Sequence, residues 1–243
     1  LIPLDLFPTS TVKNITVSKV YEANTFADYS GAHIDISTKE STGGDFFNIG
    51  FNMGGQFNTL LQDFYTMDRA QSLFKNPGID SRFINMEKTD FETAVKNENP
   101  FNTTFDVKKR ISLPNFSGNI AGGKDWEVGG QTLSLLASFT ASNGEQTTRD
   151  AFFRTLEAGG STLDRFNYDS YAQELKLGAL ANLSYTLRTA DHIGYTFFYS
   201  RNIVDTYMRR EGIDYEDHNL IGNNNTTHIY SLQNHQINGH HEF

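Results

Sequence analysis

The sequence predicts an all-β fold, in which antiparallel up-and-down strands form part of a transmembrane β-barrel. The main observation is that every odd-numbered residue between Leu175 and Leu187 is apolar. Such an alternation is typical of a strand with one apolar face. It lasts for more than a dozen residues, whereas strands in soluble cores usually have about five or six. This strand is therefore expected to face a layer as thick as the hydrocarbon core of a membrane.

Composition agrees with a barrel and excludes other classes. Of the 243 residues only 37% are hydrophobic, and no apolar run approaches the roughly 18 to 20 residues that a spanning helix needs. A barrel strand crosses with about 9 to 11 residues, of which only alternate ones meet lipid, so low hydropathy is expected. Aromatic residues reach 13%, which suits strands and interfacial girdles. The net charge of −9 argues against a nucleic-acid partner, because phosphate binding needs clustered Lys and Arg.

The same alternation recurs along the chain and predicts about six strands. Clear repeats occupy residues 47–53, 133–141 and 193–199, and weaker ones occupy 113–126 and 227–243. In the last of these the apolar parity changes between Leu232 and Ile237, which a β-bulge would reconcile. Six strands cannot close a wide barrel, so we expect one wall with two open edges.

The predicted connections alternate between long and short. Residues 59–111, 143–172 and 206–226 read as long polar loops, and 127–131 and 188–191 read as tight turns. An up-and-down barrel would then have all its long loops on one side, as outer-membrane barrels do. Loops longer than about 12 to 15 residues are uncommon in compact soluble domains. A soluble β-rich adhesin or binding domain remains the alternative.

Two further features limit the interpretation. The chain has no cysteine, which excludes a disulfide framework and a thiolate zinc site. It begins at Leu1, without an initiator Met or a signal peptide, and we therefore expect it to be a piece of a longer polypeptide.

The first 42 residues have a different sequence pattern from the long strands. Short strands are expected at Val12–Lys19 and His33–Lys39, around a turn-rich stretch. Residues Ile15–Tyr21 and Phe26–Lys39 resemble the end of the plug domain of TonB-dependent outer-membrane receptors, in which a strand reading like IEVLKG is followed by a glycine turn and by INIxTK. Gly31 matches the glycine of that family, whereas Tyr21 stands where the family usually has glycine.

Later segments are similar to barrel strands of the same family, in the branch that carries an N-terminal carboxypeptidase-like regulatory domain. They are Gly178–Tyr185, Ala190–His192, Tyr230–Leu232 and Gln236–His241. The resemblance implies that residues 1–42 are the C-terminal part of a plug domain. Residues 43–243 would be the N-terminal part of a 22-stranded barrel.

The resemblance also implies a function, namely energy-coupled uptake of a scarce nutrient such as a siderophore–iron complex, a glycan or a peptide. The implied cellular location is the outer membrane of a Gram-negative bacterium. The implied partners are outer-membrane lipid, the nutrient and the TonB complex, and a surface lipoprotein is a further partner that the branch allows. A passive porin-type barrel is a second hypothesis. No cofactor and no catalytic residue is expected, because the sequence has no Ser-His-acid order, phosphate-binding loop or close carboxylate pair.

Aromatic residues in the predicted loop 143–172 are the candidates for contacting a substrate, because exposed aromatic rings offer rigid contact area. They are Phe152, Phe153, Phe166, Tyr168 and Tyr171. Packing of these rings against one another within the loop is the alternative.

Three further groups of residues are considered as metal ligands or as residues that order a loop. Asp214, Glu216 and Asp217 are weak candidates for a hard cation such as calcium, but their spacing does not match an EF-hand, and a solvated acidic loop is the preferred interpretation. His235 and His241 would lie about 20 Å apart along one strand, too far to share a metal ion. Gly78, Asp80 and Arg82 loosely match a family pattern that orders the loop.

The alternation finally assigns the two faces of the strand at 175–187. Its odd residues are expected to face lipid, and its even residues the lumen and plug. Replacing Ala181 with arginine should then cost about 2 to 4 kcal/mol near the bilayer midplane. The same change at Asn182 is expected to be milder.

Overall fold

The computed structural model describes residues 12–19, 33–38, 44–67, 78–101, 106–187 and 191–241. These residues are mostly in antiparallel strands, with few helices, so the expectation of an all-β fold is confirmed. A six-stranded sheet in the order β10-β9-β8-β7-β6-β3 dominates, and two two-stranded sheets accompany it. No helix in the described part of the chain is both long and apolar enough to cross a membrane.

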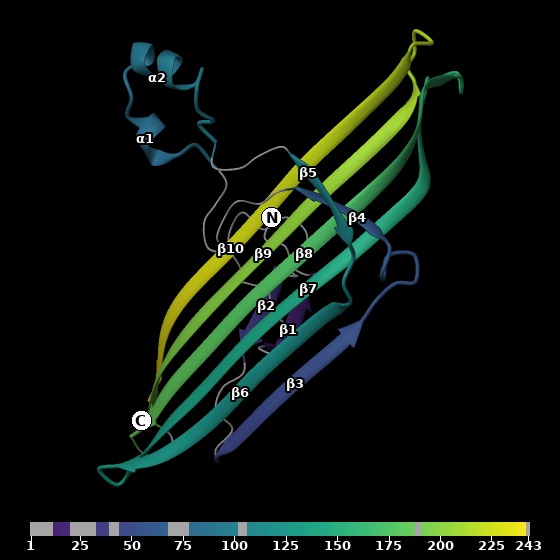
Figure 1. Cartoon of the computed structure of the whole chain (residues 1–243). Helices are drawn as coiled ribbons and strands as arrows, with labels where there is room; N and C mark the ends of the chain where they lie inside the picture. Colours follow the sequence, from purple (N-terminus) through teal and green to yellow (C-terminus); the bar gives the residue numbers. More distant parts are fainter. Residues whose placement is uncertain are drawn as a thin grey trace.

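The large sheet consists of long strands that lie side by side (Figure 1). Their order along the chain is β3 Phe46–Gly54, β6 Asn115–Val128, β7 Gln131–Leu156, β8 Thr162–Thr186, β9 His192–Ile213 and β10 Asn219–His240. The longest, β7, has 26 residues, or about 85 Å at 3.3 Å per residue. From β6 to β10 each strand pairs with the next along the chain. Within the described chain the sheet is open, with β3 and β10 at its edges.

Two of the three long loops were wrongly predicted. Strands β7 and β8 continue through most of 143–172 and leave residues 157–161 as the turn, and β9 and β10 leave only 214–218. The paired strands stay in register almost to these turns, apart from a bulge between Thr148 and Ala151 and an irregularity near Leu156. In the halves of these strands that lead to residues 157–161 and 214–218, polar and apolar residues occur on both faces, so the apolar alternation that signals a strand is missing there.

The first long connection is real but structured. Between β3 and β6 lie the paired strands β4 Asp63–Met67 and β5 Val107–Ile111, with the short helices α1 Ser81–Ile84 and α2 Lys88–Ala94 between them. Figure 1 shows β4 and β5 crossing in front of the large sheet, and the two helices standing apart from it.

The structure describes one of the two predicted tight turns completely and the other only in part. Gly129 and Gly130 form the turn between β6 and β7, and both have positive φ angles, of 64° and 77°, which glycine adopts without steric cost. At the other turn, 188–190 lie outside the described residues, and the N–H of Leu187 donates to the carbonyl of Asp191 at 2.8 Å.

Strand β10 contains no bulge, contrary to the sequence-based suggestion. Its pairing with β9 is unbroken from Asn219 to His240. Tyr230 and Leu232 therefore lie on one face and Ile237 on the other, as the alternation of side chains along a strand requires. The parity change reflects a strand that carries apolar residues on both faces.

The two short strands ahead of the large sheet are confirmed. Strand β1 Val12–Ser18 pairs antiparallel with β2 His33–Thr38. Figure 1 draws this pair on the side of the large sheet away from β4 and β5. Tyr21, Gly31 and the rest of the turn-rich stretch lie outside the described residues.

Candidate functional site

One face of the large sheet is apolar and exposed; we call it the apolar face. Direct pairing of Ile49 with Ile120, and of Ile120 with Phe139, places these residues on it, because directly paired residues share a face. Phe47, Ile49, Phe51 and Met53 of β3 are each 68–69% exposed. Other exposed large side chains of this face include Phe116, Ile120, Trp126, Phe139, Leu183, Ile193, Tyr195 and Ile237.

The opposite face is polar, and much of it is buried. Its side chains alternate with those of the apolar face and include Ser138, Asn182, Thr196 and Ser200, all less than 10% exposed. A small apolar cluster of Leu136, Leu180 and Phe198 is buried among them. Exposed apolar side chains on one face and buried polar ones on the other reverse the usual distribution in a soluble sheet.

The apolar face ends at a similar level on neighbouring strands. It gives way to polar residues between Ala141 and Asn143 on β7, between Leu175 and Gln173 on β8, and between Ile203 and Asp205 on β9, where Arg201 already interrupts it. From Leu175 to Leu187 the strand covers about 40 Å, which at a tilt of about 40° is a rise of about 30 Å. That height covers the apolar band of about 25 Å in outer-membrane barrels.

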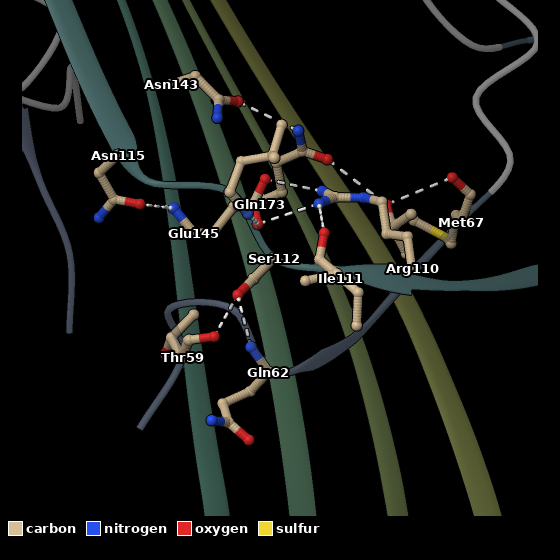
Figure 2. A network of polar contacts seen from close by, with 12 residues as sticks. Thr59, Gln62, Met67, Arg110, Ile111, Ser112, Asn115, Asn143, Glu145 and Gln173 are labelled. Carbon is tan, nitrogen blue, oxygen red and sulfur yellow. Dashed lines mark hydrogen bonds and ion pairs between the residues drawn. The ribbon is translucent and has the colours of Figure 1, made fainter. Parts of the chain in front are cut away.

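Beyond the apolar face, the connection from β3 to β6 is fastened to β7 on the same side of the sheet; we call these contacts the anchor network (Figure 2). Its centre is Glu145, whose side chain is only 1% exposed. The carboxylate accepts hydrogen bonds from Arg110 Nη1 at 3.0 Å and Nη2 at 2.8 Å, and from the N–H of Leu113 at 3.0 Å. A bidentate ion pair of this kind fixes the relative orientation of the two side chains and also pairs their charges.

The anchor network also holds the turn that follows β3. Thr59 Oγ1 accepts a hydrogen bond from the N–H of Thr147 at 2.8 Å, and Asn58 Nδ2 donates to the carbonyl of Thr147 at 3.0 Å. The Ser112 hydroxyl donates to the carbonyl of Thr59. Sequence reasoning missed this network, because Arg110 and Glu145 are 35 positions apart and no local pattern links them.

The five aromatic candidates lie in strands, so the prediction that they belong to a loop is wrong. Phe152 and Phe153 lie exposed in β7, and Phe166 and Tyr168 lie half-buried in β8. Tyr171 is buried against Phe64 and Tyr207 beneath β4, where a ligand could not reach it.

Three of these residues line one hollow. Phe152, Phe153 and Phe166 line an open hollow of about 310 Å³ with Arg154 and Arg165. The guanidinium of Arg154 lies 5.4 Å from the centre of the Phe152 ring, within reach of a cation–π interaction. Tyr168 lines a neighbouring hollow of about 230 Å³ with Asp169 and Arg209. The outer ends of β7, β8 and β9 thus offer aromatic and charged groups to a ligand.

Gly212 lines the hollow at Phe152, Phe153 and Phe166 and lies close to the backbone of β8. A Cβ atom at this position would lie 2.0 Å from the carbonyl oxygen of Arg165 and 2.7 Å from Cα of Phe166, so only glycine fits. We expect Gly212→Ala to destabilise the outer ends of β8 and β9 by about 1 to 3 kcal/mol, measured as faster limited proteolysis of the two outer turns. Gly144→Ala is the control, because its Cβ would meet nothing closer than 4.0 Å. Equal proteolysis of both variants would show that the close approach does not constrain the chain.

The acidic candidates form a turn. Asp214 Oδ1 accepts hydrogen bonds from the N–H of His218 at 2.8 Å and of Glu216 at 2.9 Å. The hydrogen bond from the backbone of His218 is the main reason that the pKa of Asp214 lies below its usual value, although desolvation opposes the shift. Among the described residues no group of three or more His, Cys, Asp or Glu side chains could hold a metal ion.

The remaining candidates make separate contacts. His235 Nδ1 lies 2.7 Å from the hydroxyl of Tyr195, and His241 Nδ1 lies 2.8 Å from a carboxylate oxygen of Asp191. Asp80 caps α1 by accepting the N–H of Arg82 at 3.1 Å, and Arg82 forms an ion pair with Glu98. The last two contacts order the helical part of the long connection.

The chain therefore presents three surfaces with distinct chemistry: a broad apolar face, a polar face behind it, and an aromatic hollow at the outer strand ends. No protein-family model, no curated protein and no solved structure matches this chain.

Proposed function

We propose that this chain is part of a TonB-dependent outer-membrane receptor, which imports a scarce nutrient such as a siderophore–iron complex, a glycan or a peptide. The single observation that carries the proposal is the apolar face. Twelve large apolar side chains, named above, are exposed on one side of one sheet. Contiguous apolar surface on this scale marks a protein or membrane interface.

Lipid explains this surface better than a protein partner does. The apolar face is bounded by polar residues on successive strands, and its height matches a hydrocarbon layer. In lipid, backbone groups at a sheet edge must be paired. The edge strands β3 and β10 would therefore pair with further strands of a closed barrel.

Two features favour a receptor over a passive porin. The paired strands β1 and β2 precede β3, at the place where the family resemblance puts the last plug strands. The polar face would then line the lumen and meet the plug. The hollow at Phe152, Phe153 and Phe166 would lie on the outer side, where a nutrient arrives.

Fractionation followed by a binding assay tests the proposal. The full-length gene product should sediment with outer membranes and should bind the purified periplasmic domain of TonB. A product that enters the outer membrane without binding TonB would favour the porin hypothesis. A product recovered in the aqueous fraction without detergent would favour the soluble adhesin and contradict the membrane proposal.

A further inference from the structure

The turn after β3 and the end of β5 carry exposed apolar side chains that the apolar face does not include. Phe57 is 99% exposed, Leu61 66%, Leu113 56% and Ile111 52%. We call these four residues the rim patch. Phe57 follows Met53 by four positions and Leu113 precedes Phe116 by three. Since Met53 and Phe116 are the outermost large residues of the apolar face on β3 and β6, the rim patch continues that face outward.

The rim patch lies on the same side of the sheet as the apolar face. The anchor network fastens it to Glu145 and Thr147, whose side chains have the same parity on β7 as Leu135 and Phe139. The pairing of β7 shows no register shift before Thr148. The turn and β5 therefore sit on the outward surface, directly above the apolar band.

The rim patch is also held rigidly. Within the turn, the N–H groups of Thr59 and Leu60 both donate to the carbonyl of Gln56, at 2.9 and 2.8 Å. The N–H of Ser112 donates to the carbonyl of Gln62 at 2.9 Å, which joins the turn to the end of β5. A rigid support that keeps a phenylalanine in full contact with water would be unfavourable in a soluble protein.

We propose that the rim patch is a membrane-interface anchor, inserted at the boundary between headgroups and acyl chains of the outer leaflet. The inference depends on the proposed function, because it takes the apolar face to lie in lipid. Apolar groups at such a boundary bury themselves by about 5 to 10 Å, and each buried side chain contributes free energy in proportion to its apolar area. The anchor network sets the height of the patch relative to the band.

Tryptophan fluorescence tests the anchor. The only tryptophan of this chain, Trp126, and every tryptophan in the rest of the full-length protein are first replaced by phenylalanine. Single tryptophans are then placed at Phe57 in the rim patch, at Phe51 in the apolar face and at Phe152 in the outer hairpin. Phe152 is a matched control because it is also an exposed phenylalanine, at 70%. The full-length protein is reconstituted in phosphatidylcholine vesicles whose acyl chains carry bromine either near the headgroup or near the chain end.

The three variants should give three different results. Phe57→Trp should lose emission mainly to shallow bromines, Phe51→Trp should be quenched from within the acyl region, and Phe152→Trp should keep its emission with both lipids. Quenching at Phe51 but not at Phe57 would overturn the anchor and leave the membrane proposal intact. No quenching at either position would overturn both.

Discussion

Ala181→Arg should destabilise the protein in a bilayer by about 2 to 4 kcal/mol, because it places a cation on the lipid side near the midplane. Ala181 pairs directly with Ala137 and Phe197, and both neighbours belong to the apolar face. No acidic residue shares these paired positions. The free energy of unfolding, measured with denaturant in lipid vesicles, reports the cost.

The structure changes the best control for this substitution. Asn182 is only 4% exposed and donates to Thr196 Oγ1 at 2.9 Å. Arginine at this position would displace packed neighbours, and this steric effect would destabilise the protein whichever face lies in lipid. Asn48 is exposed on the polar face of β3, next to Ile49 on the apolar face. We expect Asn48→Arg to cost little. An equal cost for Ala181→Arg and Asn48→Arg would show that the faces are wrongly assigned.

Glu145→Ala should release the anchor network, at a cost of roughly 3 kcal/mol. Removing one partner of a buried ion pair typically costs about 3 to 5 kcal/mol, because the other charge is left without compensation. The lower end applies because the side chain of Arg110 is 29% exposed and can regain water. The loss should appear as faster amide hydrogen exchange in residues 106–114, with β6 to β10 still protected.

Lys109→Ala provides the matched control on the same strand. The ion pair of Lys109 with Asp63 spans 2.7 Å, but both side chains are about half exposed, and surface pairs contribute about 0 to 1 kcal/mol. If Lys109→Ala accelerated exchange as much as Glu145→Ala, burial of Glu145 would not be what holds the segment.

The strands that carry an apolar face were predictable, and their outer halves were not. Between Leu175 and Leu187 the environment differs on the two sides of β8, so the sequence alternates and reveals the strand. From Thr162 to Glu174 polar residues occur on both sides, and the apolar ones, such as Phe166 and Tyr171, also fall on both sides, so no single apolar face reveals the strand. The residues Asn, Asp and Thr that suggested a loop find partners within the sheet, as Asp169 does by accepting a hydrogen bond from the N–H of Asp150 at 3.0 Å.

The candidate site was predictable only in part, for a related reason. The aromatic residues were predicted to share one loop, and the structure places Phe152, Phe153 and Phe166 around one hollow at the ends of two strands. Tyr171 could not be separated from them, because its burial depends on Phe64, more than a hundred positions earlier. The anchor network likewise depends on contacts between distant segments, which composition and periodicity do not encode.

The most direct test of the central claim, that one face of this sheet lies in lipid, is a nitroxide scan of β3. The chain has no cysteine, so once any cysteine in the rest of the full-length protein is replaced by serine, a thiol introduced at Phe47, Asn48, Ile49, Phe51 or Asn52 is unique. Both faces of β3 are exposed at these positions, so a label need not displace packed neighbours. In vesicles containing the full-length protein, labels at the odd positions should relax with oxygen dissolved in lipid, and labels at the even positions with a water-soluble chromium complex. Equal access of the chromium complex to all five positions would contradict the account.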